Sequence, residues 1–218
     1  LTPQMSRHFG LSKERVHQTF NSVIKFMAVV SMPIGIGISV LARPIILFLY
    51  GETYLPSVPV LAILIWTIPL LSLSWMCGSL TTASDKEKKA VRVYFGAFLL
   101  NLLSNLYVIP RYGYIGAAVT TIATEAAALI MFYLVLHKDF PITDFKNSLI
   151  KPITAGLLMG LVISFIRDWN LLIIVPIGAM IYVGSLFLLR PFNNQEWEIV
   201  KGFQAKLMGR WQRLRAPR

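Results

Sequence analysis

Charged residues are scarce in this sequence, and acidic residues are the scarcest. Of 218 residues, only 14% are Asp, Glu, Lys or Arg, with 10 acidic against 21 basic, while 56% are hydrophobic. Soluble proteins average about 25% charged residues. The deficit excludes an ordinary soluble domain, which covers its surface with charge, and it indicates a protein that lies mostly in lipid.

Cysteine and histidine are nearly missing too. Cys77 is the single cysteine, and the histidines are His8, His17 and His137. A disulfide needs two cysteines, and zinc sites need Cys or His pairs at short spacing. No histidine has an acidic partner at a defined spacing, and no glycine-rich phosphate loop precedes a helix. We therefore expect no metal, no cofactor and no enzymatic activity.

Long runs with no charge, or with the single charge of Arg43 or Glu125, fill most of the chain. A hydrocarbon core of about 30 Å requires roughly 20 apolar residues of helix. Six runs approach this length: 26–50, 57–80, 93–110, 112–136, 152–166 and 171–189. The shortest, 152–166, is flanked by Lys151 and Arg167, whose long side chains can reach the interface. The sequence predicts an all-α membrane protein with six transmembrane helices.

The basic residues alternate between connections. All but three of the 21 Lys and Arg residues lie in 1–25, 81–92, 137–151 and 190–218, which are connections on one side of a six-span protein. Basic connections stay in the cytoplasm. We predict a multi-pass protein with both termini cytoplasmic, whose charge reflects topology and lipid contact. We expect membrane lipids as partners and no nucleic acid.

Prolines interrupt the first two spans at Pro33, Pro44, Pro59 and Pro69. Proline lacks the backbone donor and its ring clashes with the preceding turn, so kinks are expected. In lipid, each carbonyl that loses its donor must find a partner within the bundle or in a wet cavity. Kinked spans suit a transporter that moves, although proline is also generally commoner in membrane helices than in soluble ones.

The last part of the chain has a different pattern. Residues 196–215 place Val200, Phe203, Leu207, Trp211 and Leu214 on one helical stripe, with basic residues mostly off it. This pattern predicts an amphipathic helix on the cytoplasmic leaflet, held by apolar burial and anionic lipid. RNA binding by the same basic tail is the less favoured alternative.

Three segments carry a family resemblance. They are "LTPQMSRHFGLSKERV" at 1–16, "SMPIGIGISVLARPIILFLYGETYLPSVPVLAIL" at 31–64, and "NLLSNLYVIPRYGYIGAAVTTIATE" at 101–125. In this order and spacing they resemble the second half of a polysaccharide or lipid-linked oligosaccharide flippase of the multidrug/oligosaccharidyl-lipid/polysaccharide exporter superfamily. The most specific part is the Asn-rich helix end, the Ile-Pro-x-Tyr-Gly turn and the Gly-Ala-Ala start of the next helix.

The resemblance implies a fold and a division of the chain. Members have twelve to fourteen helices in two six-helix lobes around a central cavity. On that register, residues 1–136 form part of the C-terminal lobe with four transmembrane helices, 137–190 an appended helix pair, and 191–218 a basic cytoplasmic tail. The chain would then be a fragment of a fourteen-helix, two-lobed transporter whose N-terminal lobe is missing.

The resemblance also implies a function, which is polysaccharide biosynthesis of the O-antigen, lipopolysaccharide or teichoic acid type. A lipid-linked oligosaccharide would cross the bacterial inner membrane by alternating access. Three alternatives remain open: a drug/cation antiporter of the same superfamily, a membrane interaction module without transport, and an intramembrane glycosyltransferase. The enzyme alternative needs paired acids near one interface, and only Asp139 and Asp144 come near that pattern.

Five polar residues are candidates for substrate or ion contact. Glu125 lies about 17 Å into its helix, where a charge costs on the order of 2.5 to 3.5 kcal/mol, so it either couples transport to a cation or contacts Asn, Ser or Thr on a neighbour. Arg43 is a candidate for pyrophosphate contact or snorkelling, and Lys25 an orientation charge. Asn101 and Asn105 lie four residues apart, so cross-helix hydrogen bonds are the alternative to ligand binding.

Overall fold

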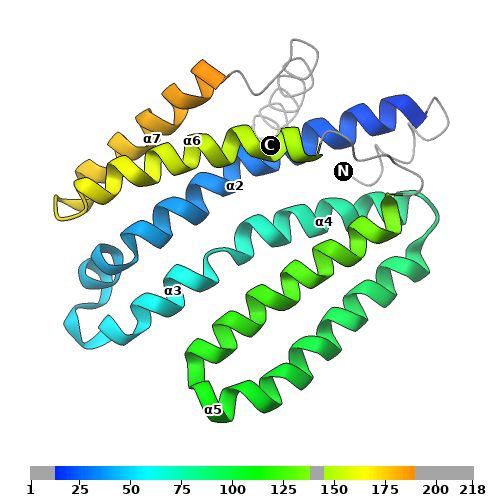
Figure 1. Ribbon diagram of the computed structural model, residues 1–218, viewed down its shortest axis with the longest axis horizontal. Coiled ribbons are helices and arrows are strands. Elements are labelled where there is room, and N and C mark those ends of the chain that lie inside the picture. Colours follow the sequence, from blue (N-terminus) through cyan, green and yellow to red (C-terminus); the bar gives the residue numbers. More distant parts are fainter. Residues whose placement is uncertain (1–12, 138–144, 190–218) are drawn as a thin grey trace, which may run out of the picture.

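The computed structural model describes residues 13–137 and 145–189, and every regular element in these ranges is helical. The elements are α2 (Lys13–Tyr50), η1 (Glu52–Ser57), α3 (Val58–Leu64), α4 (Thr67–Ala83), α5 (Glu87–Leu136), α6 (Phe145–Phe165) and α7 (Leu171–Leu189). Figure 1 shows them as an elongated bundle of helices. The all-helical prediction is confirmed. The amphipathic tail predicted at 196–215 lies outside the described residues.

Four segments are long and apolar enough to cross a membrane. They are Phe20–Tyr50, Glu52–Ala83, Glu87–Leu136 and Leu171–Leu189, and a shorter apolar helix covers Leu149–Phe165. The third segment contains two of the predicted spans, because α5 folds back on itself. The shorter helix is the span predicted to be the shortest, at 152–166. The chain is therefore a multi-pass membrane protein.

The reversal within α5 occurs at Gly113, which has φ +56° and ψ −144°. Residues other than glycine rarely adopt this backbone conformation, because their Cβ atom clashes with the backbone. Figure 1 shows two arms of α5 that lie side by side and run in opposite directions from this point. We call residues 87–112 the first arm and 114–136 the second arm. The Tyr-Gly turn predicted from the sequence is thus the bend of a helical hairpin.

The prolines act differently along the chain. α2 remains helical through both Pro33 and Pro44. The second predicted span is instead divided at Ile65–Trp66, four residues before Pro69, where the proline ring would meet the carbonyl of Ile65. That carbonyl accepts the amide of Ile68 at 3.1 Å, a tighter turn than an α-helix makes. Of the expected interruptions, only this one separates two helices.

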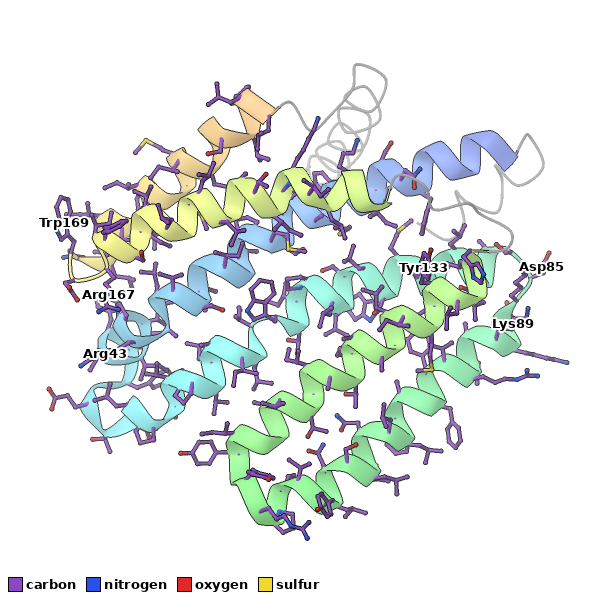
Figure 2. The ribbon with its side chains drawn as sticks, viewed as in Figure 1. Arg43, Asp85, Lys89, Tyr133, Arg167 and Trp169 are labelled. Carbon is purple, nitrogen blue, oxygen red and sulfur yellow. The ribbon has the colours of Figure 1, made fainter. Side chains whose placement is uncertain are left out.

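The connections collect at two opposite ends of the bundle. Figure 2 places Arg43, Arg167 and Trp169 at one end, with the α2–η1 and α6–α7 connections, and Asp85, Lys89 and Tyr133 at the other. The alternation on which the topology prediction depends is therefore present. Two residues before the bend of α5, the guanidinium of Arg111 lies 3.6 Å from the centroid of the Tyr107 ring, which is a cation–π contact.

Two hydrophobic cores share α2. The first core joins the N-terminal half of α2 to α4 and both arms of α5, with Phe20 and Ile24 as its α2 members. The second core joins the C-terminal half of α2 to α6 and α7, with Ile36 and Leu41 as its α2 members. We call these groups of helices the first and second packing units. Pro33 lies on α2 between the two sets of core residues.

Candidate substrate and ion site

Three of the five candidate residues come together in the α5 hairpin. Asn101 and Asn105 lie on the first arm, and Glu125 lies on the second arm. The arms are antiparallel neighbours, so residues about midway along each arm face the same depth of the membrane. The side-chain amide of Asn101 donates to the hydroxyl of Thr124 at 3.0 Å, which joins the arms beside Glu125. The cross-helix hydrogen bond foreseen for this asparagine is present.

The hydrogen bonds continue in a line that we call the polar ladder, made of Asn105, Asn101, Thr124 and Thr121. The amide of Asn105 donates to Oδ1 of Asn101 at 3.0 Å. The hydroxyl of Thr124 in turn donates to the backbone carbonyl of Thr121 at 2.9 Å. Polar groups in hydrocarbon must be satisfied by protein, and this ladder joins four residues through three hydrogen bonds.

One acceptor at the end of the ladder has no partner. Oδ1 of Asn105 is buried and accepts no hydrogen bond from the described residues. On α4, the hydroxyl of Ser74 is likewise buried without a partner. One helical turn after Ser74, a Cβ atom added to Gly78 would meet the side chains of Tyr94 and Phe132 on the two arms of α5. Oxygen atoms of this kind coordinate hard cations or accept hydrogen bonds from buried water.

Glu125 is half-buried beside the ladder. Within the described ranges it forms no hydrogen bond and no ion pair, and its neighbour Thr124 is directed to Asn101 instead. A carboxylate at this depth is costly unless a proton, a cation or another helix satisfies it. The described residues also contain no group of three or more His, Cys, Asp or Glu that could hold a metal ion. The side chains of the polar ladder beside Glu125 contribute amide and hydroxyl groups.

Arg43 and Lys25 do not join this cluster. They lie on α2, about 27 Å apart at 1.5 Å per residue. Arg43 is exposed at the end of the bundle that also holds Arg167 and Trp169 (Figure 2). Lys25 is half-buried towards the other end of α2 and interacts with other groups of the chain. Their positions suit charges near the two membrane interfaces, and any substrate contact by either residue stays a prediction.

Sequence reasoning missed Thr121, Thr124 and Ser74. A usable signal existed for Thr121, because it precedes Glu125 by four residues and shares one side of the helix with it, whereas Thr124 lies one residue before Glu125 and faces a different direction. No comparable signal existed for Ser74. Its burial depends on how α4 packs against the hairpin, which local spacing does not specify.

Comparisons with known proteins connect this geometry to a family. The family model described as "Lipid II flippase MurJ" matches residues 1–184. An uncharacterized membrane protein of Methanocaldococcus jannaschii is 22% identical over 204 residues, covering 91% of this chain and 40% of its own length. An uncharacterized membrane protein in the cps region of Klebsiella pneumoniae is 24% identical over 186 residues, covering 81% and 38%.

A solved structure shares the fold. The inward closed conformation of the lipid II flippase MurJ superposes with a TM-score of 0.72 at 20% identity, over 87% of this chain and 42% of that one. The chain thus spans about two fifths of the length of these relatives. An all-helical partial lobe fits the exporter superfamily that the motifs indicate. Because the family model covers most of the sequence, the chain belongs to the lipid II flippase MurJ family.

Proposed function

We propose that this protein takes part in moving a lipid-linked saccharide across the bacterial inner membrane by alternating access. The observation that carries the proposal is a half-buried polar ladder between two membrane-spanning arms, in a chain whose family model describes a flippase. Such a substrate combines a lipid, which stays in the bilayer, with a polar head that cannot cross hydrocarbon unaided. A helical bundle that alternately opens to each side provides the route.

The chain acts together with a further lobe in this proposal. Its relatives are more than twice as long as the part it matches. A cavity between two lobes needs a second wall, and the exposed apolar side chains of the first arm, among them Phe98, Leu103 and Leu106, face outward from this half. The N-terminal lobe expected from the sequence supplies that wall, and membrane lipid covers the remainder.

The substrate is either lipid II or a longer lipid-linked oligosaccharide for O-antigen, lipopolysaccharide or another surface polysaccharide. The family description favours the first, and the relative in the cps region is the observation that favours the second. Depletion of the protein distinguishes them by mass spectrometry of the lipid-linked saccharides that accumulate. Accumulation of peptidoglycan precursors supports lipid II, whereas accumulation of a longer oligosaccharide supports polysaccharide export. A lipid pool identical to that of undepleted cells contradicts both.

We assign Glu125, Asn101 and Asn105 to a cation site that drives transport. Cation binding in one state and release in the other biases the equilibrium between inward-open and outward-open forms. Glu125→Gln removes the charge and retains the shape, so surface saccharide should fall at equal protein level. Glu52→Gln is the matched control, because Glu52 is exposed at the start of η1 and outside the hairpin. Unchanged surface saccharide in the Glu125 variant would remove it from the mechanism.

Orientation follows from charge. With basic connections in the cytoplasm, the bundle end that carries Asp85 and Lys89 faces inward, and both termini are cytoplasmic. Arg43 then lies at the outer interface, where its guanidinium is placed for an anionic linker leaving the transporter. Lys25 lies at the inner side as an orientation charge.

A further inference from the structure

Pro33 leaves a backbone carbonyl without its helical partner. In an α-helix the amide of each residue donates to the carbonyl four positions earlier, and proline has no amide hydrogen. The carbonyl of Val29 therefore lacks the donor that residue 33 would otherwise supply. In a membrane-spanning helix water is not available to replace it, so the protein must provide a donor or bear the cost.

Tyr182 provides that donor from the other end of the chain. Its hydroxyl donates to the Val29 carbonyl at 2.7 Å, across 153 residues of sequence. The Tyr182 side chain is only 5% exposed and belongs to the second core. A buried tyrosine hydroxyl needs a hydrogen-bond partner as much as the orphaned carbonyl does. Each group satisfies the other, and the bond ties α7 directly to α2.

The backbone carbonyl of Ala62 also receives a hydrogen bond from a side chain on another helix. At the break between α3 and α4 the amide of Trp66 donates to Ile63, which leaves the carbonyl of Ala62 without its α-helical partner. The hydroxyl of Ser39 on α2 donates to that carbonyl at 2.8 Å. By contrast, Thr81 and Thr82 donate to carbonyls four residues earlier in their own helix. Cross-helix donors thus meet carbonyls that a helix irregularity has released.

Pro33 lies at the boundary between the two packing units, and the hydrogen bond from Tyr182 to Val29 crosses this boundary. The part of α2 before Pro33 contributes to the first packing unit, and the part after it contributes to the second. A helix that lacks one hydrogen bond at the boundary bends there more easily than elsewhere. Tyr182 belongs to the second unit, while Val29 lies on the side of the first. The bond therefore spans the boundary at its weakest point.

We propose that Tyr182 is a lock on a hinge at Pro33, and that α7 controls the angle between the two packing units. While the hydroxyl holds the Val29 carbonyl, the two units keep one arrangement. When α7 shifts, the bond breaks and α2 bends at Pro33. The use of this motion in transport rests on the proposed function, whereas the lock itself does not. Tyr182 is a positioning residue in this mechanism, because it acts through α2.

A double-mutant cycle tests the lock in the full protein in lipid nanodiscs. Tyr182→Phe leaves the Val29 carbonyl unsatisfied and should lower the melting temperature by about 5 °C. Pro33→Ala restores an amide that donates to the same carbonyl, so adding Tyr182→Phe in that background should cost about 1 °C. Tyr133→Phe is the control, because that tyrosine is 45% exposed. Equal losses in both backgrounds overturn the proposed role of Tyr182.

Distances between the packing units test the hinge independently of stability. Spin labels at Val91→Cys on α5 and Val175→Cys on α7 use exposed positions, in a Cys77→Ala background. Double electron–electron resonance should give a broader distribution of distances between the labels in Tyr182→Phe than in the labelled protein without this substitution. Adding Pro33→Ala should make the distribution narrow again. An unchanged width in Tyr182→Phe overturns the hinge. If the unmutated protein transports no lipid-linked saccharide, only the proposed function is contradicted. The melting temperatures and the distance distributions do not depend on transport.

Discussion

At the scale of single residues, two polar side chains of the membrane interior find partners on another helix or on the other arm of the hairpin. Asn101 reaches Thr124 across the hairpin, and Tyr182 reaches Val29 across the two packing units. Each of these bonds satisfies a group that lipid cannot satisfy. The Oδ1 of Asn105 has no such partner among the described residues, and our proposal places a cation beside it and Glu125.

The Asn101–Thr124 bond gives a prediction at this scale. Thr124→Val keeps the size of the side chain and removes the acceptor, so the half-buried amide of Asn101 loses its partner, at a cost of about 1 kcal/mol. Thr82→Val is the matched control, because the Thr82 hydroxyl bonds only within its own helix. Unfolding in detergent measures both variants. A Thr124 variant as stable as the Thr82 variant would mean that the bond between the arms contributes nothing.

At the scale of helices, the sequence predicted the positions of the spans better than their shapes. The run at 57–80 was expected as one span, yet α3 and α4 are separate because Pro69 disrupts the turn before it. The hairpin was predictable because Gly113 follows a proline and divides two apolar runs. The lock was not predictable, since its partners are 153 residues apart and only the packing of α7 brings them together.

The bend of the hairpin gives the second prediction. Gly113→Ala places a side chain on a backbone with φ +56° and ψ −144°, which costs on the order of 1 to 3 kcal/mol although no atom crowds the site. Gly184→Ala is a matched control, because Gly184 is helical and also has open space around it. Circular dichroism during heating should show a lower melting temperature for the first variant alone. Equal stability of the two would contradict a strained bend.

Docking of α6 gives the third prediction. Gly156 and Gly160 lie one turn apart on α6, and a Cβ atom on either would collide with the side chain of Ile36 on α2. Overpacking of this kind costs about 1 to 3 kcal/mol. Gly160→Leu should therefore weaken the second packing unit, whereas Gly184→Leu should not. Limited proteolysis of the α6–α7 connection measures this, and equal cleavage of both variants would show that close approach to α2 is unimportant.

At the scale of the whole molecule, the structure is two packing units that share α2, within a family of membrane flippases. The opposite ends of the bundle carry different connections, so orientation is testable. With Cys77→Ala as background, Lys88→Cys should react with a membrane-impermeant thiol reagent only after the cells are opened. Asp168→Cys should react in intact cells, because Asp168 is at the opposite end and its side chain is 93% exposed. The reverse pattern would invert the proposed topology.

The domain division expected at 136/137 stays a prediction, and the transported saccharide belongs to our proposal for the complete transporter. Sequence motifs led to the exporter superfamily because the Asn-rich helix end, the glycine bend and the small residues after it are local features. In our proposal the saccharide is recognised by a cavity that both lobes form, which explains why no local pattern in this half specifies it. The relatives extend well beyond the matched region, in line with this dependence on a second lobe.

The most direct test of the central claim is the sidedness of lipid-linked saccharide in cells with and without this protein. An impermeant glycosidase or lectin added to spheroplasts measures the fraction that has reached the outer leaflet. We predict that depletion strongly lowers this fraction while the total pool rises, and that the Glu125→Gln protein does not restore it. An outer-leaflet fraction that is unchanged on depletion would contradict transport of a lipid-linked saccharide by this protein.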